Sequence, residues 1–159
     1  ASLEDWDRMI DTNVKGAMYV MKYGIPLLKN PQGGHIIQMS SVVSREVYVG
    51  GSVYSATKHA LDAIHRTLRL ELLPWPIKLT SINPGLVETE FSLVRFAGDA
   101  DRAQKVYQDI EALKAEDVAD VVAYCLSLPK HVNLPEVHIT ASAQATATKV
   151  RKKDGSIRG

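Results

Sequence analysis

The run His35-Ile36-Ile37-Gln38-Met39-Ser40-Ser41 decides the fold class of this chain. Its mostly apolar residues follow a turn at Asn30-Pro31-Gln32-Gly33-Gly34, which predicts a short strand buried on both faces. A second run, residues 77–82, is rich in β-branched residues and ends at Asn83-Pro84-Gly85. We expect both runs to be strands of one parallel sheet, so their polar ends lie at the same ligand-binding edge.

Segments with helical periodicity lie before, between and after these predicted strands. Apolar residues recur every third or fourth position in residues 2–28, in residues 52–73 and in residues 115–128. Shorter helices are predicted at residues 88–97 and 101–113, and a third strand at residues 137–139. This alternation predicts an α/β fold in which crossover helices join about three parallel strands.

Composition excludes several classes of protein. The chain has 159 residues, 45% of them hydrophobic, and a formal net charge of +1, which are ordinary values for a globular domain. The single Cys125 excludes an internal disulfide and fits a reducing cytoplasm, where we expect the protein. No apolar run suits a membrane span, the near-zero charge gives no reason to expect nucleic acid, and the five histidines lack metal-site spacing.

Tyr54 and Lys58 are four residues apart on the second predicted long helix, so they share one helix face. A tyrosine hydroxyl has an ordinary pKa near ~10, and an adjacent ammonium lowers that pKa by favouring the phenolate. Such a pair can donate a proton to a carbonyl oxygen or take one from an alcohol. A surface tyrosine beside a surface lysine is the alternative on spacing alone.

Two further polar residues have two interpretations each. Ser41 stands at the strand-end edge, where its hydroxyl can donate to a substrate oxygen, or it is a plain turn residue. Asn13 lies among apolar residues of the first helix, where a buried amide needs hydrogen-bond partners. It is either a structural amide or part of a functional hydrogen-bond chain.

These residues occur in a known order. Asn13-Val14-Lys15-Gly16, Ser41, Tyr54-x-x-x-Lys58 and Pro84-Gly85-x-Val87-x-Thr89 resemble the short-chain dehydrogenase/reductase family. The stretch GLVETEFSLVRF at residues 85–96, with His131-Val132-Asn133, is similar to its NADP-dependent 3-hydroxy acid (serine or allo-threonine) dehydrogenases. The resemblance implies the C-terminal part of a Rossmann-like doubly wound parallel sheet, without the N-terminal βαβ half.

The resemblance also implies a role for each position. Tyr54 would be the catalytic acid–base, with Lys58 lowering its pKa and holding the nicotinamide ribose. Ser41 would polarise the hydroxyl or carbonyl of a small-molecule substrate, and Asn13 would hold a water in a proton relay. Tyr54, Lys58, Pro84, Gly85, Val87 and Thr89 would bind the cofactor, with NADP expected and NAD as the alternative. The helices containing Asn13 and Tyr54 would form a homo-oligomer interface.

One part of the family pattern is absent from these residues. No three glycines are spaced as a phosphate-binding turn, and the chain begins without Met at what looks like a helix cap. We therefore expect residues 1–148 to be a partial dehydrogenase domain that binds NADPH poorly by itself, and residues 149–159 to be a basic, disordered tail. The alternatives are a non-catalytic dimerising fragment, or a reductase of ketone or 3-oxoacyl substrates.

Overall fold

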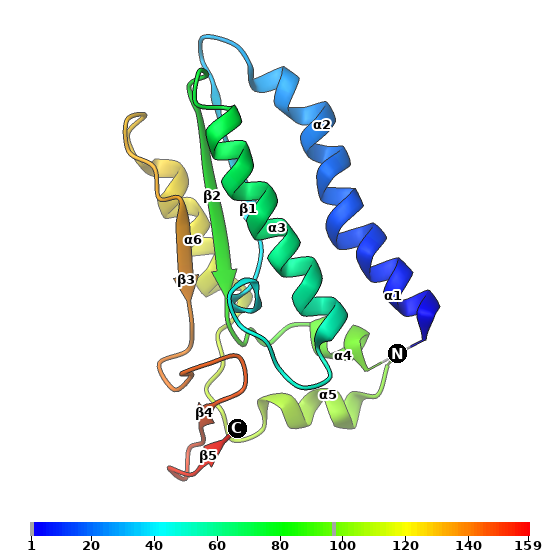
Figure 1. The fold of residues 1–159 in the computed structure, drawn as a ribbon. Helices are drawn as coiled ribbons and strands as arrows, with labels where there is room; N and C mark the ends of the chain where they lie inside the picture. The colour runs from blue at the N-terminus through cyan, green and yellow to red at the C-terminus, as the bar shows by residue number, and fades with distance from the viewer. Residues whose placement is uncertain (1, 97) are drawn as a thin grey trace.

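Three parallel strands form the centre of the fold. The structure is a computed structural model that describes residues 2–96 and 98–159, and its main sheet has the order β1-β2-β3 (Figure 1). The strands are β1 (Gly34–Met39), β2 (Ile77–Pro84) and β3 (Glu136–Ile139). Gly34 pairs with Ile77 and Met39 with Ile82, so β1 and β2 end at nearly the same level. The predicted α/β fold with a three-stranded parallel sheet is confirmed.

Helices cover both faces of this sheet (Figure 1). One face carries α1 (Leu3–Ile10), the π-helical turn η1 (Asp11–Gly16), α2 (Ala17–Leu28) and α3 (Ser52–Glu71). The other face carries α6 (Ala115–Ser127). The core lies between α6 and the sheet, where Ile82, Val118 and Cys125 are buried together. Burial of this apolar surface is the main force that holds the layers together.

The first helix is interrupted, unlike the continuous helix that the sequence predicts. It begins at a capping box, in which the Ser2 hydroxyl accepts from the Asp5 amide at 3.1 Å. From Asp11 to Gly16 the backbone widens into a π-helical turn before the α-helix resumes. Asn13 and Gly16 are weak helix formers, so this stretch departs from α-helical geometry at little cost. Such turns are frequent at functional sites.

The segments after the strands lie below the carboxyl ends of the sheet (Figure 1). They are η2 (Val42–Ser44), α4 (Phe91–Arg95) and α5 (Ala100–Tyr107). The last two are shorter than predicted, and the predicted end of the first, Ala97, lies outside the described residues. Asp99 starts α5 by accepting a hydrogen bond from the Arg102 amide at 3.0 Å, and the chain is extended again at Gln108.

The expectation of a disordered tail from residue 149 is wrong. The tail forms an antiparallel hairpin of β4 (Val150–Arg151) and β5 (Ile157–Arg158), with Gly155 at positive φ in the turn. Val150 is buried, and the Arg158 guanidinium donates to the carbonyl of Val106 at 2.7 Å. A buried apolar residue and anchored hydrogen bonds outweigh the basic composition on which the expectation rested.

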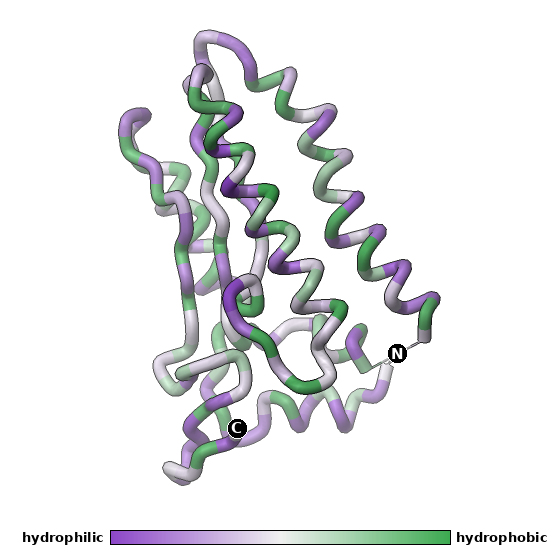
Figure 2. The backbone as a smooth tube through the Cα atoms, in the orientation of Figure 1, coloured by the Kyte–Doolittle hydropathy of each residue, from purple (hydrophilic) through white to green (hydrophobic). Residues whose placement is uncertain are grey.

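Part of the apolar surface stays uncovered in the described residues. There β1 pairs with β2 on one side only, and hydrophobic positions recur along α2 (Figure 2). Val20, Tyr23 and Leu27 on α2 are each more than 70% exposed. Within the described residues, the helices are too short or too polar to cross a membrane.

Candidate active site

A hollow of about 650 Å³ opens at the carboxyl ends of β1 and β2. It gathers residues from separate elements, because parallel strands and the helix that follows β1 meet at this edge. Six of the eight residues singled out from the sequence line it: Ser41, Tyr54, Pro84, Gly85, Val87 and Thr89. Asn13 and Lys58 do not line it. The strand-end arrangement expected from the sequence therefore brings most of these residues together.

Ser41 is held firmly at the end of β1. Its hydroxyl donates to the carbonyl of Pro84 at 3.4 Å and accepts from the amide of Val43 at 3.2 Å, which starts η2. Ser41 is buried, as is Pro84 at the end of β2. The contact therefore joins the ends of two neighbouring strands. The adjacent Ser40 hydroxyl is buried at the hollow with no hydrogen-bond partner among the described residues.

Tyr54 lies on the first turns of α3 and faces the hollow. Its ring is tilted against the ring of Phe91, with 5.7 Å between the centroids. Burial raises the pKa of the Tyr54 hydroxyl above its ordinary value, and hydrogen bonding with Ser41 lowers that pKa by a smaller amount. Tyr48 adds to the rise and the positive charge of Arg95 opposes it. The balance keeps the phenol in its protonated form.

Lys58 lies one turn along the same helix, as the spacing predicts. Its ammonium is 5.6 Å from the centre of the Tyr54 ring. Burial lowers the pKa of Lys58, because an ammonium is less well solvated away from water. The groups that act on the pKa of Tyr54 here are Ser41, Tyr48 and Arg95, and burial of the phenol outweighs the lowering effects. A lowering by Lys58 stays a prediction.

Asn13 reaches α3 from the π-helical turn. Its side-chain amide donates to the Thr57 hydroxyl at 3.2 Å, and Thr57 in turn donates to the carbonyl of Tyr54 at 2.8 Å. Thr57 is 2% exposed, so the Asn13 contact is made inside the protein. Asn13 is thus tied to the turn of α3 that carries Tyr54 and Lys58. Its contact is with Thr57, not with Lys58.

The loop after β2 is held by residues that the sequence analysis did not single out. The Gln144 side chain accepts from the Leu86 amide at 2.8 Å, and it packs so close to Gly85 that a Cβ there would lie 2.9 Å from the Gln144 Cδ. The Tyr107 hydroxyl donates to the Val87 carbonyl at 3.0 Å. Gln144 is distant in sequence and belongs to no motif, so no local signal marks it.

Comparison with known proteins assigns the chain to a family. The family model described as short chain dehydrogenase matches residues 1–100. The chain belongs to the short-chain dehydrogenase family. It is 48% identical over 149 residues to an uncharacterized oxidoreductase of Mycobacterium tuberculosis, covering 94% of this chain and 59% of that protein. It is 42% identical over 148 residues to the NADP-dependent 3-hydroxy acid dehydrogenase of Escherichia coli, covering 92% of this chain and 60% of that protein.

The solved structures agree with these relatives. The closed form of serine dehydrogenase complexed with NADP+ has a TM-score of 0.89 and 42% identity, over 92% of this chain and 60% of that one. The chain therefore spans about 60% of the length of the short-chain dehydrogenases that it matches. The resemblance stated from the motifs to this family and to its NADP-dependent 3-hydroxy acid dehydrogenases is confirmed.

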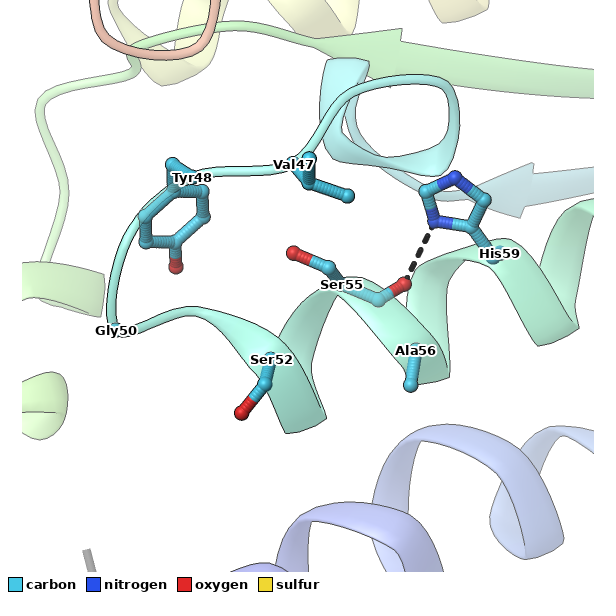
Figure 3. A pocket seen from close by; sticks show the side chains of 7 residues that line it. All are labelled: Val47, Tyr48, Gly50, Ser52, Ser55, Ala56 and His59. Carbon is cyan, nitrogen blue, oxygen red and sulfur yellow. Dashed lines mark hydrogen bonds between the residues drawn. The ribbon is translucent and has the colours of Figure 1, made fainter.

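This short-chain dehydrogenase chain has a second hollow, of about 470 Å³, beside the first turns of α3 (Figure 3). Val47 and Tyr48 lie on the loop opposite Ser55 and His59. The His59 Nδ1 donates to the Ser55 carbonyl at 2.9 Å, because a carbonyl can only accept. The buried Ser55 hydroxyl points toward the loop and has no hydrogen-bond partner among the described residues.

Proposed function

We propose that this chain supplies the proton-transfer and substrate side of an NADP-dependent dehydrogenase that acts on a 3-hydroxy acid. The observation that carries the proposal is the joint placement of Tyr54, Ser41 and the loop after β2 around one hollow at the carboxyl edge. The names of the relatives support the choice of cofactor and substrate class. Ketone and 3-oxoacyl substrates are the competing class.

The residues around the hollow fit the nicotinamide end of NADP. About 650 Å³ is room for a ring and a small substrate, and Pro84, Gly85, Val87 and Thr89 form one wall. The unpartnered Ser40 hydroxyl indicates that this edge is built to face a polar ligand. When bound, the nicotinamide accepts or donates the hydride. Lys58 would hold the ribose that carries it.

The chain's own residues would move the proton. In reduction, the Ser41 hydroxyl donates a hydrogen bond to the substrate carbonyl, and the protonated Tyr54 hydroxyl gives its proton to the same oxygen. In oxidation the proton moves the other way, from the substrate hydroxyl to the Tyr54 oxygen, which must first give up its own proton to solvent. Asn13, through Thr57, would fix the turn of α3 that presents both Tyr54 and Lys58.

We further propose that a cofactor-binding half is needed for activity. The described residues lack a Gly-rich phosphate-binding turn, and the chain spans 59% of one relative and 60% of another. A fluorescence titration of NADPH should therefore show binding weaker than micromolar for the 159-residue chain by itself. Micromolar binding would contradict this proposal. A non-catalytic dimerising fragment is the competing view, and an inactive full-length gene product would favour it.

Self-association is the third element of the proposal. The exposed apolar residues of α2, with the small exposed residues Ser52, Ala56 and Ala63 of α3, form two adjacent helix faces suited to a second copy. The resemblance implies an interface through the helices that contain Asn13 and Tyr54. Asn13 lies in η1, directly before α2, and Tyr54 lies on α3. Light scattering of the full-length gene product should give a mass above that of one subunit. A strictly monomeric enzyme would overturn this element.

The decisive assay uses the full-length gene product with NADP and a panel of alcohols. We expect reduction of NADP, followed at 340 nm, with 3-hydroxy acids such as serine and 3-hydroxybutyrate. Activity restricted to ketones and 3-oxoacyl thioesters would replace the substrate class while keeping the reaction. No activity with any alcohol or carbonyl compound would overturn the proposed function.

A further inference from the structure

The 650 Å³ hollow at the carboxyl ends of β1 and β2 is lined by several basic side chains. Its lining includes four cationic side chains and no Asp or Glu: Arg95, Arg102, Lys105 and Arg158. Within the part of the chain that the structure describes, none of these four forms an ion pair. Cations that form no ion pair attract an anionic ligand into the hollow. The proposed function, on which this inference rests, places a carboxylate-bearing substrate there.

Of these four cations, Arg95 is the one whose charge acts on the pKa of the Tyr54 hydroxyl. The ring of Phe91 contacts the ring of Tyr54, and Arg95 is four residues further along α4, on the same helix face as Phe91. The Arg95 charge is close enough to the Tyr54 hydroxyl to act on it. Arg102, in contrast, belongs to α5 and lies 4.4 Å from the ring of Phe96.

Aromatic rings hold Arg95 in place. Its guanidinium carbon is 5.1 Å from the centre of the Tyr48 ring and 5.4 Å from that of Phe96. The Tyr48 ring packs closely against Gly51, where a Cβ would come within 2.6 Å of the ring atom Cε2. Stacking uses the face of a guanidinium and leaves its N–H donors free. Among the described residues, this guanidinium makes no hydrogen bond.

We propose that Arg95 binds the carboxylate of the substrate and thereby selects 3-hydroxy acids over neutral alcohols. A planar guanidinium can bind both carboxylate oxygens at once, which orients the substrate as well as holding it. In a 3-hydroxy acid the carboxylate is two carbons from the carbon that bears the hydroxyl. Anchoring the acid at Arg95 therefore directs that hydroxyl toward Tyr54 and Ser41.

The test compares an acid with its neutral ester in the full-length gene product. Arg95→Met keeps most of the apolar stem and removes the charge, while Arg95→Lys keeps the charge and removes the planar group. With 3-hydroxybutyrate we expect kcat/KM to fall about 10- to 100-fold in Arg95→Met, the range for losing a hydrogen bond to a charged group. With methyl 3-hydroxybutyrate we expect less than about threefold change. Arg95→Lys should recover part of the loss with the acid.

Two further measurements separate the competing explanations. The KM for NADP should be unchanged in Arg95→Met, because a rise there would assign Arg95 to a cofactor phosphate and overturn the proposal. The exposed Arg69→Met, at the far end of α3, is a matched control for removing an arginine charge. The activity with the ester reports directly whether each variant has folded.

The outcomes also separate this inference from the proposed function. An equal loss with acid and ester would make Arg95 a structural residue and overturn the proposal. A wild-type protein that oxidises neutral alcohols but not the acid would keep the dehydrogenase reaction and overturn the role of Arg95. A wild-type protein with no activity on either compound would overturn both.

Discussion

The hollow lies between two regions that are built in different ways. The strand-end residues Ser40, Ser41, Asn83 and Pro84 are buried and fixed by the register of β1 and β2. The α4–α5 segment, residues 91–96 and 98–107, contains two short helices, and the apolar residues Phe91 and Val94 of α4 are 49% and 78% exposed. It is positioned over the site by ring contacts and by the Tyr107 hydrogen bonds to Val87 and Ser92. Few buried contacts make a region easier to rearrange.

This difference divides the site by task. Groups proposed to move a proton are on the sheet edge or on α3, where a small displacement is costly. The group proposed to choose the substrate, Arg95, is on the exposed segment. Substrate choice can therefore change at Arg95, whereas Phe91 and Tyr107 of the same segment contact Tyr54 and Val87 and belong with the reacting side. The following variants test that division.

The largest effect is expected on the sheet side, from Tyr54→Phe in the full-length gene product. The variant keeps the ring that contacts Phe91 and removes the hydroxyl, so the fold should remain while proton transfer is lost. We expect kcat to fall by about 10²- to 10⁴-fold, the usual contribution of a positioned acid–base group. Tyr124→Phe, at an exposed tyrosine of α6, is the matched control. Unchanged turnover in Tyr54→Phe would remove the assigned role.

A smaller effect, on stability, is expected where the sheet edge meets the C-terminal segment. In Gly85→Ala the new Cβ would lie 2.9 Å from the Cδ of the buried Gln144, whose side chain also binds the Leu86 amide. Overcrowding of this kind costs about 1–3 kcal/mol, measurable from urea unfolding. Gly24→Ala is a control, because nothing lies within 4 Å of a Cβ at that position.

A double variant identifies the cause. Gln144→Ala should destabilise the protein by itself, because the Leu86 amide loses its acceptor. If crowding is the reason for the Gly85→Ala loss, the double variant should be less destabilised than the sum of the single ones. Simple additivity would show that the two residues act independently.

The sequence predicted the sheet side of this comparison better than the α4–α5 side. Strand ends, helix spacing and the Tyr54–Lys58 pair are local patterns, so the residues around β1, β2 and α3 could be placed before the structure was known. The contacts of Arg95 with Tyr48 and Phe96, and of Gln144 with Leu86, join distant or irregular segments. Sequence periodicity does not predict such contacts, because they depend on how the loops fold over the sheet.

Two differences between the structure and the expectations from charge have the same origin. The basic residues after Lys149 predicted a disordered tail, but Val150 is buried and the hairpin is anchored through Arg158. The spacing of Tyr54 and Lys58 predicted a lowered tyrosine pKa, but burial of the phenol raises that pKa. Charge is visible in a sequence, whereas desolvation depends on tertiary structure.

The smallest effect is expected from acid, and it should fall on the sheet side. His65 on α3 is 1% exposed and its Nε2 donates to the carbonyl of Pro135 at 2.9 Å, directly before β3. Burial lowers the pKa of His65 below 6.5, and Arg69 lowers it slightly, whereas the Pro135 bond, Glu136 and Asp62 oppose this. Burial and Lys78 also lower the pKa of His35 on β1. The α4–α5 segment contains no histidine.

The sign of the pH effect follows from these directions. As the pH falls below about 6.5, the unfolded chain takes up a proton that the folded protein resists, so stability is complete above that pH and declines below it. Urea midpoints at pH 7.5 and pH 5 should therefore differ less in His65→Gln than in the wild type, with a remainder due to His35 and to carboxyl groups such as Glu136 whose pKa is lowered in the folded protein. The exposed His131→Gln should keep the full wild-type difference. If the difference between the two urea midpoints is unaltered in His65→Gln, a neutral His65 does not hold α3 to the sheet. Another group would then cause the acid sensitivity of the sheet side.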